Sequence, residues 1–324
     1  MQDTKETYRR LCEQEPSIPL FSQPWWLDST AGPDRWDVAL LEKGGLVLAT
    51  MPFIKSRRAG FRISTQPWLT LALGPWLRPS NAKTPRRIAQ QKELLQGLIE
   101  QLPPFDHFEQ KWHYDQTNWL PFRWHGFTQT TDYSYVIPDL SDLTVVWNGF
   151  QENIRKEIRK ASGRSQLCVR DDRPFSDLLR LHRMSFGRQG RALPYPESFI
   201  RKIDEACDSR NQRRLFIAED VQGRQHAAVY IVWDSNSAYY LLGGGDPALR
   251  NSGAASLCMW EAIRFASTVT RRFDFCGSMA EPIEHFVRAF GGSQCPYFSV
   301  SKTPSKVLAS YLFLTSFRPA PRAA

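Results

Sequence analysis

The sequence predicts a mixed α/β protein in which a strand-rich first half is followed by strands that alternate with helices. β-rich runs dominate the first half, and two of them are joined by Gly44-Gly45. Residues 138–142 interrupt this pattern with a proline and polar residues. Beyond them, apolar residues recur at helical spacing between further β-rich runs. Strands that meander and then alternate with helices indicate an α/β (α+β) fold.

The first half contains two helical segments among strands. In "SQPWWLDST", Ser22 is a candidate N-cap before a proline, which predicts a short helix. "WDVALLEKGGLVLATMPFIKS" predicts a hairpin, and "FRISTQPWLTLALGPWL" predicts further strand with interruptions. Residues 84–102 carry apolar side chains at helical spacing and end before a Pro-Pro pair. Strands are expected near 105–109 and 128–137.

The second half opens with an amphipathic helix and ends with a strand. Its predicted helices lie near 147–160, 174–187, 196–209 and 252–269, and its predicted strands near 214–220, 226–233 and 237–243. "RRFDFCG" then predicts a short strand, "EPIEHFVRAFGG" a helix with a glycine stop, and "CPYFSVSK" a last strand.

The chain is basic, with 42 Lys and Arg against 33 Asp and Glu, and a formal charge of +9. This charge favours anionic partners such as nucleic acid, phosphorylated cofactors or acidic lipid headgroups. A solvated basic surface is the alternative, and net charge alone does not separate the two.

Cysteine usage and the absence of long apolar runs predict a cytoplasmic protein. The six cysteines are scattered without metal-binding or paired spacing, which fits a reducing compartment. The first 15 residues lack the apolar core of a signal peptide, and no run reaches the roughly 20 residues that span a bilayer. "SKVLASYLFLTSF" is expected to pack as a closing helix, with peripheral membrane contact as the alternative.

A polar loop before the long helix is the clearest candidate for a binding site. It consists of Arg250, Asn251, Ser252, Gly253, Ala254 and Ala255. The first amides of a helix lack intrahelical partners and carry partial positive charge, so they suit a pyrophosphate. Small residues let the backbone approach a ligand, and Arg250 offers a charged contact. An ordinary turn between strand and helix is the alternative.

Arg250, Gly253 and Ala255 match the cofactor motif of the GNAT acyltransferase superfamily, which the loop resembles. "FQENIRKEIRKASGR", "RRFDFCGSMAEPIEHFVRAFGG" and "CPYFSVSK" are similar to the FemAB-like and BioF2-like branch. The resemblance implies two tandem GNAT-like lobes with mixed sheets flanked by helices. They would comprise residues 1–140 and 141–303, the second lobe carrying the cofactor loop. Residues 304–324 would form a closing helix that can return to the first lobe.

The resemblance also implies an activity. The expected reaction moves an acyl group from acyl-CoA, acetyl-CoA or longer, to an amine acceptor by direct attack. In that case no covalent intermediate is needed, and the protein orients the reactants, accepts a proton and stabilises an oxyanion. The alternatives are an aminoacyl-tRNA-dependent transferase acting on a cell-envelope or polysaccharide precursor, and a catalytically silent binding protein.

Four side chains are candidates for catalysis. Asp274 lies between two aromatics and could act as a base, or it could point to solvent or bind nearby backbone. Glu281 precedes a proline at a helix start, where helix capping is favoured over catalysis. In the resembled family a basic residue near Arg288 stabilises developing charge, and a surface arginine is the alternative. Tyr297 could protonate a leaving thiolate, but packing is favoured.

The basic face of the helix near 147–160 is a candidate for phosphate contact. Its cations are Arg155, Lys156, Arg159 and Lys160. Phosphates of CoA, tRNA or lipid are possible ligands, with a solvated amphipathic face as the alternative. The histidines lack metal-binding spacing, so no metal is expected. Three of them lie among tryptophans in 107–125, a stretch that could line an acceptor pocket or pack in the core.

Overall fold

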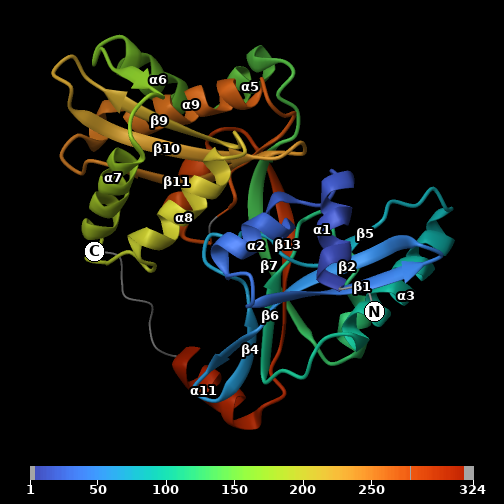
Figure 1. Cartoon of the computed structure of the whole chain (residues 1–324). Helices are drawn as coiled ribbons and strands as arrows, with labels where there is room; N and C mark the ends of the chain where they lie inside the picture. Colours follow the sequence, from blue (N-terminus) through green and yellow to red (C-terminus); the bar gives the residue numbers. More distant parts are fainter. Residues whose placement is uncertain (1–3, 278, 317–324) are drawn as a thin grey trace. The chain divides into compact units, whose positions relative to one another are not determined.

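The computed structural model describes residues 4–277 and 279–316, and they form the mixed α/β fold that the sequence predicts (Figure 1). The chain divides into two compact units. Unit 1 contains residues 4–132 and 296–316, and unit 2 contains residues 133–295. The chain passes from unit 1 to unit 2 within strand β7 (Thr128–Ile137) and returns within β13 (Ser293–Lys302).

Unit 1 is built from helices around antiparallel and mixed strands. Its remaining elements are α1 (Thr4–Gln14), η1 (Leu20–Ser22), α2 (Pro24–Thr30), β1 (Trp36–Lys43), β2 (Leu46–Ile54), β3 (Ser56–Arg58), β4 (Phe61–Thr65), β5 (Trp76–Leu77), α3 (Thr84–Glu100), β6 (His107–Lys111), α4 (Leu120–Trp124) and α11 (Lys306–Ser316). Strands β1, β2 and β5 form one sheet, and β3, β4, β6 and β13 lie in that order in another. The predicted hairpin is β1–β2, with positive φ at Gly44 and Gly45.

Two sequence-based expectations for unit 1 differ from the structure. Gln23 rather than Ser22 occupies the N-cap position of α2, without a capping hydrogen bond, because Ser22 ends the preceding 3-10 turn and is buried there. The apolar run after Phe61 is not one interrupted strand: β4 ends at Thr65, and only Trp76–Leu77 returns to a sheet. The closing helix α11 begins at Lys306, and residues 317–324 of the expected segment 304–324 lie outside the described residues.

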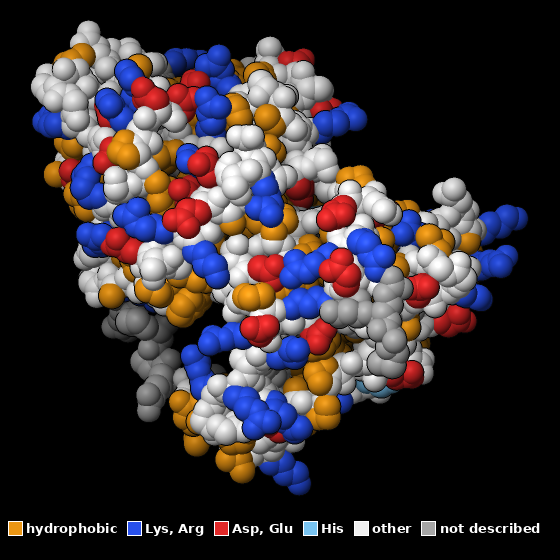
Figure 2. Space-filling view, viewed as in Figure 1, with side chains coloured by type: hydrophobic (Ala, Val, Ile, Leu, Met, Phe, Trp, Pro, Cys, Tyr) orange, Lys and Arg blue, Asp and Glu red, His pale blue; other side chains and the backbone are white. Residues whose placement is uncertain are grey.

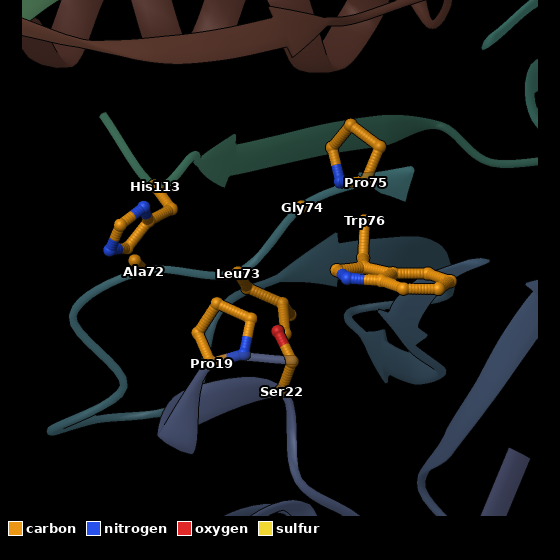
Figure 3. A pocket seen from close by; sticks show the side chains of 8 residues that line it. All are labelled: Pro19, Ser22, Ala72, Leu73, Gly74, Pro75, Trp76 and His113. Carbon is orange, nitrogen blue, oxygen red and sulfur yellow. The ribbon is translucent and has the colours of Figure 1, made fainter. Parts of the chain in front are cut away.

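The aromatic-rich stretch of residues 107–125 contributes Trp112 and Phe122 to the core of unit 1, whereas Trp124 is exposed. Trp112 is fully buried, and an alanine methyl group at Gly74 would lie 2.6 Å from its ring. His113 lines a small cavity together with Ser22 and Trp76 (Figure 3). The volume of this cavity is about 20 Å³, room for one water molecule and too little for an acceptor substrate. Packing, the alternative given above, therefore describes Trp112 but not Trp124.

Unit 2 has one mixed sheet with helices on both faces. Its elements, besides parts of β7 and β13, are α5 (Leu143–Gly149), α6 (Glu152–Ser162), β8 (Cys168–Arg170), α7 (Phe175–Gly187), α8 (Glu197–Asp208), β9 (Arg213–Glu219), β10 (Gln225–Trp233), β11 (Ala238–Gly245), η2 (Arg250–Ser252), α9 (Ala254–Ala266), β12 (Phe273–Asp274) and α10 (Glu281–Arg288). The strand order is β7-β12-β11-β10-β9-β8, and only the β11–β12 pair is parallel.

The two faces of this sheet carry different helices. Apolar side chains of α5, α6, α9 and α10 form one large core cluster with the strands. On the other face, α7 contacts β11 and β10. The glycines at 243–245 belong to β11 rather than to the loop that follows. A methyl group at Gly244 would lie 2.5 Å from the His182 amide nitrogen, so this glycine lets the α7 backbone rest on the strand.

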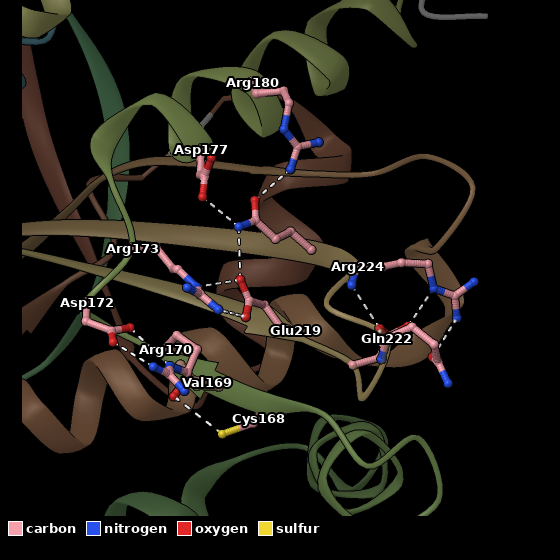
Figure 4. A network of polar contacts seen from close by, with 12 residues as sticks. Cys168, Val169, Arg170, Asp172, Arg173, Asp177, Arg180, Glu219, Gln222 and Arg224 are labelled. Carbon is pink, nitrogen blue, oxygen red and sulfur yellow. Dashed lines mark hydrogen bonds and ion pairs between the residues drawn. The ribbon is translucent and has the colours of Figure 1, made fainter.

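A polar network ties the outer strands of unit 2 to α7 (Figure 4). Arg173 donates two hydrogen bonds, of 2.7 and 2.6 Å, to the carboxylate of Glu219. Gln225 donates to both Glu219 and Asp177, and Arg180 donates to Gln225. The side chain of Glu219 is only 8% exposed, so the bidentate arginine neutralises a carboxylate that has little contact with water.

The surface is rich in cations, as the composition requires. On the face drawn in Figure 2, Lys and Arg side chains are interspersed with acidic ones, and a group of them gathers at the lower end of unit 1. In the part of the chain that the structure describes, each helix is too short or too polar to traverse a bilayer. Residues 4–277 and 279–316 hold no group of three or more His, Cys, Asp or Glu side chains arranged as metal ligands.

Candidate functional site

The candidate site of unit 2 begins where β11 ends and the chain turns into α9. Asp246 accepts a hydrogen bond from the Ala248 amide at 2.8 Å, which bends the chain into the short turn η2. Gly253 then adopts φ +80° and precedes the first residue of α9. No side chain caps this helix, so its first amides keep their partial positive charge without a protein acceptor. Arg250, Asn251 and Ala255 are exposed around them.

Helix α6 covers one side of this loop. An alanine methyl group at Gly253 would lie 2.5 Å from the carbonyl oxygen of Glu157. Ser256 donates to the Glu157 carboxylate at 2.6 Å, and Lys160 Nζ donates to the Asn251 carbonyl at 2.7 Å. The small residues therefore serve packing against α6 on one side, where Gly253 and Ala254 are buried. Only the side with Arg250 and Ala255 is open.

The four predicted cations of α6 do not share one partner. Lys160 contacts the loop, whereas Lys156 pairs with Glu152 one turn earlier on the helix surface. Arg159 lies over the ring of Trp147 at 5.8 Å, and Arg155 Nη1 donates to the Asn148 carbonyl. The structure thus brings Lys160 to the Arg250 loop and directs Arg155 and Arg159 toward α5.

Strand β12 ends in a tight turn that is held by Asp274. This side chain is 5% exposed, and its Oδ1 accepts hydrogen bonds from Ser134 Oγ at 2.5 Å and from the Cys276 amide at 2.7 Å. Cys276 has φ +60° and Gly277 has φ +48°, and a methyl group on Gly277 would collide with the Tyr133 carbonyl. Binding of nearby backbone, one of the roles weighed for Asp274, is therefore present in the structure.

β11 and β12 pair over two residues and then separate. Ala238 and Tyr239 lie opposite Phe273 and Asp274, but β11 continues to Gly245 with β10 as its strand partner. The edge of β11 that faces away from β10 is therefore free of a strand beyond Tyr239 within the described residues. The Cys276 thiol lies at the separation point near the Tyr240 backbone, and burial raises its pKa well above the ordinary value.

The other charged candidates lie on α10, and the structure does not join them to Asp274. Arg288 Nε donates to Glu284 at 2.8 Å, and Glu284 accepts from Tyr135 Oη at 2.5 Å. Ser134, the partner of Asp274, is the neighbour of Tyr135 on β7, and successive strand residues point to opposite faces of a sheet. Asp274 and the Arg288 pair are therefore anchored on opposite faces of β7.

Glu281 forms no hydrogen bond with Asp274 or Arg288 among the described contacts, and Tyr297 belongs to unit 1. Glu281 is the first residue of α10 and its side chain is 84% exposed, 4.0 Å from His285 Nε2. It forms no capping hydrogen bond, so it can stabilise the helix start only through the attraction between its negative charge and the helix dipole. Tyr297 lies in the part of β13 that belongs to unit 1 and is half-buried there.

Residues 148–285, which include the Arg250 loop, α6 and Asp274, match the family model of the acetyltransferase (GNAT) domain. The chain carries a GNAT acyltransferase domain. The protein is therefore an acyltransferase, and the family resemblance carried by Arg250, Gly253 and Ala255 is confirmed.

Solved structures extend the likeness of this GNAT protein to the whole chain. The crystal structure of FemX has a TM-score of 0.71 at 11% identity, covering 96% of this chain and 99% of that one. The C-terminal domain of a putative lysylphosphatidylglycerol synthetase from Agrobacterium fabrum has a TM-score of 0.53 at 10% identity, covering 97% of each chain. At these identities the similarity shows a shared fold. The search of curated proteins finds no match.

The GNAT domain contains a buried hydrogen-bonded pair, His182 and Tyr195, that the sequence patterns do not predict. His182 on α7 donates from Nδ1 to the Gly243 carbonyl at 2.7 Å, and its Nε2 accepts from Tyr195 Oη at 3.0 Å. Burial lowers the pKa of His182 and raises that of Tyr195 to about 12, so both are neutral at pH 7. Histidine spacing alone gave no sign of this pair. The glycines of β11 were the available signal, because they allow α7 to approach.

Proposed function

We propose that the protein is an N-acyltransferase that moves an acyl group from acyl-CoA to an amine acceptor by direct attack. The observation that carries this proposal is the uncapped start of α9, with Gly253 at φ +80° and Arg250 exposed beside it, inside the GNAT domain. Free helix amides and an unpaired guanidinium suit the pyrophosphate of CoA.

The strand edge of β11 supports the same donor. Pantetheine carries two amide groups, and a strand edge without a partner offers N–H and C=O groups that can bind them. A donor whose pyrophosphate lies at the start of α9 would extend along β11 toward Tyr239. Its thioester would then approach the point where β11 and β12 separate, near Asp274.

Asp274 is the side chain that we propose to accept the proton of the attacking amine. It lies at this separation point and is a carboxylate with little exposure, a setting in which a base is useful for amine attack. Arg288, Glu281 and Tyr297 receive no step, since Arg288 is held by Glu284, Glu281 is exposed at the start of α10 and Tyr297 belongs to unit 1.

Arg250→Ala is expected to weaken CoA binding by about tenfold, because one charge-assisted contact to phosphate contributes about 1.5 kcal/mol. Calorimetric titration of the full chain with CoA and acetyl-CoA measures the change. Arg201→Ala on α8 is the matched control. Arg201 is also exposed, but α8 does not belong to the core cluster that contains α9. Equal loss in both variants, or no CoA binding by the unchanged protein, would contradict the proposed donor site.

Asp274→Asn is expected to retain the fold and to lower the rate of acyl transfer by 10²-fold or more. The asparagine carbonyl still accepts from Ser134 and the Cys276 amide, so the turn is kept while the base is lost. Thermal unfolding and the rate of CoA release with an amine acceptor separate the two effects. A folded variant with an unchanged rate would show that Asp274 only stabilises the turn and is not the base.

An aminoacyl-tRNA donor is the second candidate, and the FemX-like fold of the whole chain favours it. The acceptor would then be a cell-envelope or polysaccharide precursor, as the family resemblance implies. Charge reversal at Arg155, Lys156, Arg159 and Lys160 should abolish tRNA binding, which should also fall steeply with salt. Binding of tRNA without binding of CoA would replace the first proposal. A folded protein that binds neither would be a silent member of the fold.

A further inference from the structure

The last helix of unit 1 presents apolar side chains to solvent. On α11, Val307, Tyr311 and Leu314 are 72%, 62% and 68% exposed, and their spacing places them on one helix face. Phe313 is 63% exposed, while Leu308 alone is buried among the large apolar residues of α11. Soluble monomers seldom leave such a cluster uncovered, so this face marks a contact surface.

Cations lie at the same end of unit 1 as the start of α11. Thr303 contacts His107 Nδ1 at 2.8 Å, and His107 is paired with Ile63 of β4. Adjacent strands are about 4.8 Å apart, so Thr303, three residues before α11, lies roughly 10 Å from β4. The β3–β4 hairpin there carries Arg57, Arg58 and Arg62, and α11 begins with Lys306. Figure 2 shows basic and hydrophobic side chains together at this lower end of unit 1.

A pocket of about 290 Å³ lies between the hairpin and the loop before β6. Its apolar lining comprises Ile54, Ile63, Pro103, Pro104 and Phe105, and its cations are Lys55, Arg57 and Arg62. Lys55 pairs with Asp37 and Arg62 with Asp106. The side chain of Arg57 forms no hydrogen bond or ion pair with any described residue, although its charge attracts Asp106.

A buried hydroxyl group also points to a ligand in this pocket. Ser64, one of the lining residues, is 7% exposed, and its Oγ has no hydrogen-bond partner within the described chain. Buried hydroxyl groups are normally paired, so this atom lacks an acceptor or donor that a bound molecule can supply. A phosphate ester satisfies both the hydroxyl and the free guanidinium of Arg57.

We propose that this face of unit 1 docks on the surface of an anionic membrane. Helix α11 lies in the interface with Val307, Tyr311 and Leu314 among the acyl chains, and the pocket takes the phosphate of a lipid headgroup. Charge complementarity favours a bilayer over a second copy of this chain. From Thr303 to Ala324 the sequence has no Asp or Glu and includes Lys306, Arg318 and Arg322. A basic protein with a net charge of +9 repels its own copies.

The test is sedimentation of the full-length protein with vesicles of phosphatidylcholine alone and with 30% phosphatidylglycerol, a composition that we choose as roughly that of a strongly anionic membrane. We expect binding to the anionic vesicles at least tenfold stronger than to the neutral ones. A Val307→Ser, Tyr311→Ser, Leu314→Ser variant should lose most of this binding without a lower unfolding temperature, because these side chains are already exposed. Val221→Ser in unit 2, whose side chain is 70% exposed, is the matched control.

A separate pair of variants tests the pocket as the binding site of the lipid headgroup. Arg57→Ala should weaken binding to anionic vesicles about fivefold or more, whereas Arg86→Ala on α3 should leave it unchanged. Binding of glycerol 1-phosphate without binding of vesicles would overturn membrane docking and leave a site for soluble phosphate esters. A dimer by light scattering that the α11 variant dissociates would assign this face to a second copy instead. Unchanged vesicle binding by the α11 variant would also overturn the proposal.

Discussion

Replacement of Gly253 by alanine is expected to destabilise the protein by about 2–5 kcal/mol and to abolish CoA binding. Two costs add. A residue with a side chain at φ +80° loses about 1–2 kcal/mol in the left-handed region. The new methyl group would also lie 2.5 Å from the Glu157 carbonyl, so α6 must move, and such overpacking costs about 1–3 kcal/mol. Urea unfolding and calorimetry with CoA measure the two effects.

Gly223→Ala is the matched control for this change. Gly223 has φ +76°, but nothing lies within 4 Å of the position of an added methyl group. Its substitution should cost about 1 kcal/mol and leave CoA binding intact. The difference between the two variants isolates the contact between α6 and the loop. Equal destabilisation by both would mean that α6 can move away at little cost in free energy. The packing of α6 against Gly253 would then not determine the conformation of the loop.

Arg173→Ala is expected to destabilise unit 2 by about 3 kcal/mol or more. The substitution leaves the Glu219 carboxylate buried with Gln225 as its remaining donor from the network in Figure 4, and breaking a buried pair in this way costs about 3–5 kcal/mol. Lys156→Ala is the control, because the Lys156–Glu152 pair is exposed on α6 and should contribute about 0.5 kcal/mol or less. Urea unfolding of both variants at pH 7 gives the comparison.

The pH dependence of this effect has a definite sign. Hydrogen bonds from Arg173 hold the pKa of Glu219 below its ordinary value of 4.5. A carboxyl group with a lowered folded-state pKa stabilises the fold above its unfolded-state pKa, and this contribution is lost as the pH falls through the folded value. The cost of Arg173→Ala should therefore shrink below about pH 4.5. A cost that stays constant down to pH 3 would show that the ion pair does not contribute the stability.

Residues close together in the sequence gave much of the local structure correctly. Gly44-Gly45 between β-rich runs predicted the β1–β2 hairpin. Helical spacing of Ile154 and Ile158 predicted the buried face of α6, but the single helix expected near 147–160 is wrong, because Phe150 is extended and separates α5 from α6. The motif of Arg250, Gly253 and Ala255 identified the superfamily. These signals are local, because turn conformation and amphipathic periodicity depend on neighbours within a few residues.

Such local patterns could not predict which distant residues contact each candidate side chain. The strand predicted at 237–243 continues through Gly245, because these glycines pair with β10, and α7 rests on Gly244. Ser134 and Asp274 are 140 residues apart and share a hydrogen bond of 2.5 Å. Arg288 resembled a catalytic cation, yet it donates to Glu284, which also accepts from Tyr135. Such contacts are set by strand pairing and helix docking, which join distant segments.

The sequence by itself therefore determined the mixed α/β class, the hairpin and the amphipathic helices, while an anion at the start of α9 stays a prediction. Each of these follows from the conformational preferences of adjacent residues and from periodic burial. Only the tertiary structure decided that α6 closes one side of the Arg250 loop, that Asp274 holds its own turn, and that α11 leaves its apolar face exposed. These features depend on which surfaces meet when the chain folds, and no local preference encodes that.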